Sequence, residues 1–214
     1  MIRGILFDLD GVLVHTDELH YQAWKKLAQR LGIPFSREQG DRCRGVSRMD
    51  SLEIVLEGAS RTYSQEEKRS FAQEKNDAYR AMLAELSPAD VPEEVIPTLE
   101  ELRRRGYRLA LASSSKNAGL ILDVTGLVSY LDAVADGTCI TRSKPDPEIF
   151  LTAARMLKLP PASCAAVDDA VAGVQAGRAA GMVAVAIGDS AACQTGDYNL
   201  EKIGQLLEIF PALS

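Results

Sequence analysis

Residues 1–14 read MIRGILFDLDGVLV, and the rest of the chain is organised around this stretch. Its apolar run at 5–7 is typical of a strand that is buried on both faces. Asp8 and Asp10 follow. Because side chains alternate along a strand, both carboxylates are predicted to point the same way. Gly11 then indicates a tight turn after the strand.

Asp8 and Asp10 are costly to bury together, because each carboxylate disfavours the charged form of the other. A divalent cation bound between them would relieve the repulsion. One carboxylate could then act as a nucleophile while the other moves protons. The alternative interpretation is a solvated turn, since Asp and Gly are both common in turns.

The composition is that of an ordinary soluble globular protein. Its 214 residues are 46% hydrophobic and 25% charged, which suits one large domain or one domain with a smaller insert. The net charge of −6 argues against nucleic acid as a partner. Neither a membrane span nor a signal peptide is evident, so we expect a cytoplasmic protein without a membrane partner, and its modest size suggests a monomer. The cysteines lack a disulfide or metal-ligand spacing, which favours reduced thiols at Cys43, Cys139, Cys164 and Cys193.

Residues 15–87 are predicted to form an all-helical block inserted directly after the first strand. Apolar residues recur at helical spacing up to Leu31, and Gly32 is expected to end that helix. Ser47 can cap a later helix, and Ser64 begins a capping box. The expected helices lie over residues 16–31, over 36–44, after Ser47, and from 64 to about 86.

Charged and aromatic side chains in this block have both a structural and a functional interpretation. His20 and Trp24 lie four residues apart on one helical face, a pattern that is more often core than site. Lys75 falls within an apolar stripe, so its ammonium either reaches water or points into a pocket. Arg48 is predicted in the first turn of a helix, where either a bound anion or water would offset its repulsion from the helix dipole.

From residue 88 onward strands alternate with helices, which indicates a mainly parallel sheet covered on both faces. The expected strands lie at 108–112, 133–135, 164–167 and 183–187, and a helix is expected to open at Ser143 and to run to about Leu157. Ligands of such sheets bind beyond the carboxyl ends of the strands. Polar residues occur at or just past four of these ends, namely Asp8 with Asp10, Ser113, Lys144, and Asp168 with Asp169.

This convergence predicts a phosphoryl-transfer site. Carboxylates from two strand ends can hold Mg²⁺, while a hydroxyl and an ammonium can hold the transferring oxygens. Each motif also has a structural explanation, because Lys144 could be a surface residue before Pro145 and Asp168-Asp169 could cap a helix. A structural explanation is plausible for any one motif, but it is much less plausible for all four at matching strand ends.

In order, the motifs resemble those of the haloacid dehalogenase-like phosphotransferase superfamily. Residues 7–12, Phe-Asp-Leu-Asp-Gly-Val, resemble its first motif, 112–117 its second and 143–145 its third. The finer resemblance is to the beta-phosphoglucomutase subfamily, through Arg-Gly-Val-Ser-Arg at 44–48 and Lys-Asn-Asp at 75–77. It implies an α/β fold with a Rossmann-like core domain and an inserted helical cap domain, comprising residues 1–14 and 88–214 and residues 15–87 respectively.

The resemblance implies that the chain interconverts beta-D-glucose 1-phosphate and 6-phosphate. Asp8 would carry the phosphoryl group, Asp10 would act as general acid and base, and Ser113 and Lys144 would hold the transferring group. Beta-glucose 1,6-bisphosphate would be the intermediate and activator. The resemblance assigns one Mg²⁺ to Asp8, Asp10, Asp168 and Asp169.

The same resemblance implies two groups of substrate contacts. The distal phosphate would be held by Arg48, Ser115, Lys116 and Asn117. The sugar pocket and cap closure would involve Thr16, His20, Trp24, Gly45, Val46, Ser51 and Lys75. The alternatives are a sugar-phosphate phosphatase on the same fold and a catalytically weak sugar-phosphate-binding protein.

Two departures from the subfamily pattern bear on these expectations. Asp168 stands where the fourth motif usually has Glu, so its shorter side chain could reach Mg²⁺ only through water. Val14-His15 replaces the usual Thr-Asp before Thr16, and we expect His15 to be exposed to solvent.

Overall fold

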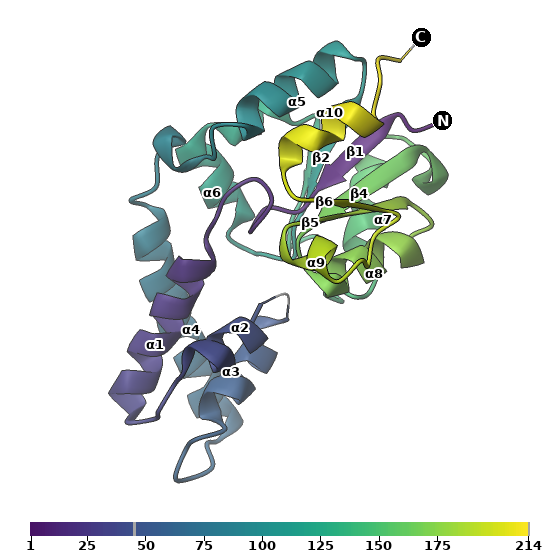
Figure 1. Cartoon of the computed structure of the whole chain (residues 1–214). Helices are drawn as coiled ribbons and strands as arrows, with labels where there is room; N and C mark the ends of the chain where they lie inside the picture. The colour runs from purple at the N-terminus through teal and green to yellow at the C-terminus, as the bar shows by residue number, and fades with distance from the viewer. Residues whose placement is uncertain (45, 214) are drawn as a thin grey trace. The chain divides into compact units, whose positions relative to one another are not determined.

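The computed structural model describes residues 1–44 and 46–213, which divide into two compact units. Met1–His15 with Leu86–Ser214 forms the α/β unit, and Thr16–Glu85 forms the helical unit inserted into it (Figure 1). In the part of the chain that the structure describes, no helix is both long and apolar enough to cross a membrane.

The α/β unit is built on a six-stranded parallel sheet with the order β3-β2-β1-β4-β5-β6. Its strands are β1 Gly4–Phe7, β2 Arg108–Ala112, β3 Ala133–Ala135, β4 Cys164–Asp168, β5 Val183–Ile187 and β6 Tyr198–Leu200. Its α-helices are α5 Val95–Arg104, α6 Ala118–Thr125, α7 Glu148–Met156, α8 Val171–Ala179, α9 Asp189–Ala192 and α10 Leu206–Ile209. Short 3₁₀ turns lie at Pro88–Asp90, Leu127–Tyr130, Pro161–Ser163 and Ile203–Gln205. As predicted, helices cover both faces of this sheet (Figure 1).

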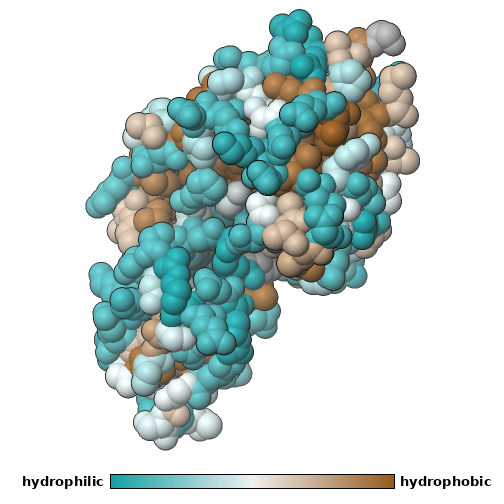
Figure 2. Space-filling model, viewed as in Figure 1, coloured by the Kyte–Doolittle hydropathy of each residue, from teal (hydrophilic) through white to brown (hydrophobic). Residues whose placement is uncertain are grey.

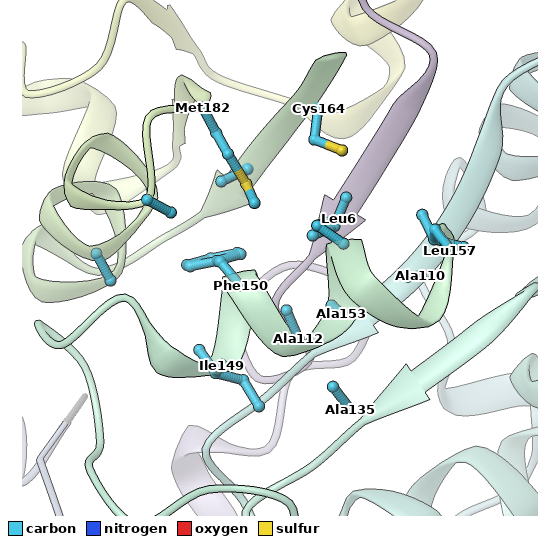
Figure 3. Close-up of a cluster of buried hydrophobic side chains, with 14 residues drawn as sticks. Leu6, Ala110, Ala112, Ala135, Ile149, Phe150, Ala153, Leu157, Cys164 and Met182 are labelled. Atoms are coloured by element: carbon cyan, nitrogen blue, oxygen red, sulfur yellow. The ribbon is translucent and has the colours of Figure 1, made fainter. Parts of the chain in front are cut away.

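Apolar residues on consecutive strands pack together because the strands are in parallel register. Leu6 pairs with Ala110 on β2 and with Ala166 on β4, and all three belong to one buried cluster. Phe150 of α7 and Met182 belong to the same cluster (Figure 3). Small alanines on the strands therefore allow α7 and α8 to approach the sheet closely.

The register also places the polar strand ends beside one another. Phe7 pairs with Leu111 on β2 and with Val167 on β4. The next residue of the first strand, Asp8, donates its backbone N–H to the Val167 carbonyl at 2.9 Å. Asp8 and Asp168 consequently come to neighbouring positions at the carboxyl edge of the sheet.

The helical unit contains α1 Asp17–Leu31, α2 Arg37–Arg42, α3 Arg48–Leu56 and α4 Gln65–Leu83. Gly32 ends α1 in the left-handed conformation, as the sequence predicts, and the hydroxyls of Ser47 and Ser64 cap α3 and α4. Its core contains Trp24, Leu27, Ala28, Ile33, Leu52, Val55, Phe71 and Ala72. The face seen in Figure 2 is mostly hydrophilic over this unit, as expected where the apolar stripes of the helices pack inward.

Three details of the α/β unit differ from the sequence prediction. β1 ends at Phe7, so strand alternation does not fix the relative direction of Asp8 and Asp10. The helix predicted from Ser143 begins only at Glu148, because the Glu148 carboxylate accepts the backbone N–H groups of the preceding loop. β6 was not predicted, since its three residues include a polar asparagine and form no apolar run.

Candidate active site

Lys144 is the centre of the polar cluster in the α/β unit. Its Nζ atom donates to Oδ1 of Asp8 at 2.5 Å and to Oδ2 of Asp168 at 2.7 Å. The centre of the Phe150 ring lies 5.1 Å from the same nitrogen, so an aromatic ring also packs beside the ammonium. Burial alone would lower the pKa of Lys144, but the carboxylates of Asp168 and Asp8 outweigh burial and raise it. Lys144 is therefore a fixed buried cation.

The Asp8 carboxyl has a strongly perturbed pKa. Burial raises the pKa of Asp8 well above its usual range, Lys144 opposes that rise, and the charges of Asp168 and Asp10 add to it. One ammonium is thus insufficient to balance the surrounding carboxylates. A divalent cation is the type of group that would restore charge balance here.

Asp8, Asp168 and Asp169 form a set that fits such a cation. One ligand oxygen from each lies within 4.8 Å of the others, and all three residues are buried. A Cβ atom at Gly11 would lie 2.1 Å from Oδ2 of Asp169, so the Asp169 carboxylate occupies space that only a glycine leaves. Oxygen donors at this spacing suit Mg²⁺.

Asp10 is not part of that carboxylate set. It follows β1 in a tight turn in which Gly11 donates its N–H to the carbonyl of Val14 at 2.8 Å. Three of the four residues that the resemblance assigns to Mg²⁺, namely Asp8, Asp168 and Asp169, thus belong to the carboxylate set. Asp10 still lies near enough to Asp8 to raise the pKa of that carboxyl.

The loop after β2 presents hydroxyl groups that can still donate. The Ser113 hydroxyl is buried and accepts the backbone N–H of Ser115 at 3.2 Å. The Ser115 hydroxyl in turn accepts the N–H of Asn117 at 3.2 Å. Because both oxygens act as acceptors within the loop, their O–H groups remain free to donate to an anion. Asn117 is buried and Lys116 is exposed.

Half-buried His20 and buried Lys75 form a pair within the helical unit. Nζ of Lys75 lies 2.8 Å from Nδ1 of His20, and Lys75 also lies over the rings of Trp24 and Tyr79. Burial lowers the pKa of His20 well below its usual range, and Lys75 and Arg48 lower it further. His20 is therefore neutral; an ammonium can only donate, so Nδ1 accepts and Nε2 carries the proton.

The other residues of the helical unit with predicted roles occupy different environments. Thr16 and Trp24 are buried, and Val46 is exposed. Arg48 is the first residue of α3, as predicted, and is half-buried. The Ser51 hydroxyl is buried and donates to the carbonyl of Cys43 at 3.3 Å, so it also fastens the loop before α3. Gly45 lies outside the described residues. His15, in the α/β unit, is exposed as expected.

Sequence reasoning missed the contacts that hold Lys144 in place. The Glu148 carboxylate accepts the N–H of Arg142 at 2.8 Å and that of Thr141 at 3.2 Å, which closes the loop carrying Lys144. Phe150 packs beside the ammonium. Both follow the Lys-Pro motif within six residues, so an acid and an aromatic residue just after that motif were the available signal.

Phosphoryl transfer is catalysed by carboxylates, a buried ammonium and hydroxyls, and here these side chains lie at the carboxyl edge of a parallel sheet. Fold and site together define an enzyme of the phosphotransferase class. The haloacid dehalogenase-like hydrolase family model matches residues 2–181, and the chain belongs to this family.

Several similar proteins have an assigned activity. The chain is 40% identical to the beta-phosphoglucomutase of Bacillus subtilis over 210 residues, which cover 94% of this chain and 93% of that protein. The crystal structure of beta-phosphoglucomutase from Clostridium difficile is 34% identical, with a TM-score of 0.90 over 98% of this chain and 95% of that one. A phosphorylated carbohydrates phosphatase of Thermotoga maritima is 29% identical over 85% of this chain and 82% of that protein.

Proposed function

We propose that this enzyme is a beta-phosphoglucomutase that interconverts beta-D-glucose 1-phosphate and beta-D-glucose 6-phosphate. The observation that carries the proposal is the buried contact of Lys144 with both Asp8 and Asp168. Ser113, which is also buried, follows β2, the strand that pairs with β1. The 40% identity to a beta-phosphoglucomutase over almost the whole of both chains supports this choice of substrate.

In the proposed reaction phosphorylated Asp8 first gives its phosphoryl group to the 6-hydroxyl of beta-glucose 1-phosphate, which forms the 1,6-bisphosphate and frees the Asp8 carboxylate. The bisphosphate turns round, and an Asp8 oxygen then attacks the phosphorus of its 1-phosphate while the bond from that phosphorus to the sugar oxygen breaks, which leaves glucose 6-phosphate. Lys144 and Ser113 hold the transferring oxygens, where they stabilise charge as it shifts in the transition state. Asp10 takes the proton from the attacking sugar hydroxyl and returns it to the leaving one. Asp8, Asp168 and Asp169 would hold Mg²⁺, which would supply charge neutralisation for the phosphoryl group.

A mutase also needs a second anion site, because its bisphosphate intermediate carries phosphates at both ends. We assign Ser115, Lys116 and Asn117 to the distal phosphate together with Arg48, whose place at the start of α3 suits an anion. The sugar contacts would come from the helical unit, serving as a cap, through His20, Lys75, Ser51, Val46, Gly45, Thr16 and Trp24. The cap would exclude water, which would otherwise hydrolyse the aspartyl phosphate.

A single incubation tests the proposal. The protein receives Mg²⁺, beta-glucose 1-phosphate and a trace of beta-glucose 1,6-bisphosphate, and glucose 6-phosphate and free phosphate are followed together. We expect glucose 6-phosphate without matching free phosphate, and no product from the Asp8→Asn variant. Absence of glucose 6-phosphate from a folded, Mg²⁺-loaded protein would contradict the proposal.

The second candidate is a sugar-phosphate phosphatase, favoured by the 29% identity to a phosphorylated carbohydrates phosphatase. It would use the same Asp8, Lys144 and Ser113, but water would replace the sugar hydroxyl as acceptor. In the incubation above, free phosphate as the main product would move the assignment to this activity.

A further inference from the structure

Helix α8 approaches the end of β4 so closely that one of its positions has no room for a side chain. A Cβ atom at Gly173 would lie 1.9 Å from both Cγ and Oδ2 of Asp168 and 2.1 Å from Oδ1. Real Cβ atoms do not come this near to other heavy atoms. The Asp168 carboxylate therefore packs directly against the backbone of Gly173, one turn into the helix.

The contact matters because each oxygen of Asp168 has a specific partner. Oδ1 accepts the backbone N–H of Ala170 at 3.0 Å, at the start of α8. Oδ2 accepts Nζ of Lys144 at 2.7 Å. Asp168 is only 1% exposed, so its carboxylate is shielded from solvent. A side chain at 173 would have to break one of these two hydrogen bonds.

We propose that Gly173 is a positioning residue, whose missing side chain fixes Asp168 between the Ala170 N–H and the Lys144 ammonium. Through Asp168, Gly173 sets the place of Lys144 and of the carboxylates that suit Mg²⁺. The short side chain of Asp168 is part of the same arrangement, because it brings the carboxylate against the backbone of α8 at Gly173. The consequence for turnover rests on the proposed function, whereas the consequences for stability and Mg²⁺ affinity do not.

Gly177, one turn further along α8, provides a matched control. A Cβ atom there would lie 2.6 Å from Cβ of Ala166, so Gly177→Ala also strains the contact between helix and sheet. It touches no carboxylate of the site. Gly119 of α6 is a second control, because a Cβ atom there meets nothing within 4 Å. Gly119→Ala should keep or raise stability, since alanine favours helices.

The experiment compares wild type, Gly173→Ala, the controls Gly177→Ala and Gly119→Ala, Asp168→Ala, and the double variant Asp168→Ala/Gly173→Ala. Melting temperature is measured on metal-free protein, and Mg²⁺ affinity is measured by calorimetry without any sugar phosphate. We expect Gly173→Ala to lower the melting temperature and to weaken Mg²⁺ binding by roughly 10- to 100-fold, as displaced ligand supports do. Gly177→Ala should lower the melting temperature with Mg²⁺ affinity unchanged.

The double variant keeps the proposal testable even if Gly173→Ala alone fails to fold. Asp168→Ala removes the three atoms nearest to the new Cβ, so Gly173→Ala should cost little in that background or even stabilise the helix. An equal loss of melting temperature in both backgrounds would overturn the proposal. So would wild-type Mg²⁺ affinity in Gly173→Ala. No sugar phosphate enters these measurements, so a wrong substrate would leave their outcome unchanged.

Discussion

The ammonium of Lys144 donates to Oδ2 of Asp168, at the end of β4, at a distance of 2.7 Å. It also donates to Oδ1 of Asp8, which follows β1. One lysine from a long loop thus joins the ends of β1 and β4. The arrangement makes Lys144 a structural cation, and the proposed function also places it against the transferring phosphoryl group.

Lys144→Met is predicted to reduce kcat by roughly 100- to 1,000-fold, because it removes a preorganised cation from the transition state. It should also lower the free energy of unfolding by about 3–5 kcal/mol in metal-free protein, because two buried carboxylates lose their partner. Steady-state kinetics and urea unfolding check the two effects. Lys26→Met, at an exposed position, is the control, and an equal loss in both variants would contradict the assigned role.

Removal of Mg²⁺ is predicted to lower stability as well as activity. A ligand present at 100 times its dissociation constant stabilises the folded state by about 2.7 kcal/mol, so adding Mg²⁺ after chelation should raise the melting temperature. Asp169→Asn should abolish most of that rise, whereas Asp123→Asn, at an exposed site, should keep it. A rise of the same size in Asp169→Asn would exclude Asp169 as a ligand.

The pairing of His20 with Lys75 in the helical unit predicts a pH dependence of stability. The pKa of His20 is lowered in the folded state, so between that pKa and about 6.5 only the unfolded chain binds the proton. Stability is then lost as pH falls below about 6.5, by up to about 1.4 kcal/mol per pH unit. The raised pKa of Asp8 changes stability in the opposite direction as pH falls. The test therefore compares the pH dependence of each variant with that of wild type. His20→Gln should flatten the acid-side loss relative to wild type, and His15→Gln should not.

Asp10→Asn is predicted to slow both half-reactions by roughly 100- to 10,000-fold, the usual contribution of general acid–base catalysis. Asp8→Asn should instead prevent phosphoenzyme formation altogether. Rapid-quench measurement of the phosphoenzyme separates the two, because Asp10→Asn retains the nucleophile. Equal and complete loss of the phosphoenzyme in both variants would contradict the division of roles.

The sequence predicted those parts of the fold that depend on local patterns. The apolar run at 5–7 and the alanine-rich strands are recognisable because both faces of a parallel sheet are buried. Gly32 ends a helix through its left-handed backbone conformation, and Ser64 begins one by capping it. Both effects depend only on residues that are close in the sequence. Lys144 and Asp168 were recognised as site candidates because each lies just past the end of a predicted strand, at 133–135 and 164–167 respectively. Of the two strands, β4 proved to be a neighbour of β1, whereas β3 pairs with β2.

Features that depend on tertiary contact could not be predicted in the same way. β6 is held by pairing with β5 rather than by its own residues. The late start of α7 results from the Glu148 carboxylate taking loop N–H groups six and seven residues earlier in the chain. The closeness of Gly173 to Asp168 depends on the distance between a helix and a strand, about which the sequence pattern is silent.

The most direct test of the central claim is covalent. The protein is incubated with Mg²⁺ and beta-glucose 1,6-bisphosphate, and intact-mass measurement with peptide mapping locates any phosphoryl group. The account predicts one phosphoryl group on Asp8, which beta-glucose 1-phosphate discharges much faster than water does. A phosphoryl group on another residue, none at all, or discharge by water at the same rate would contradict it.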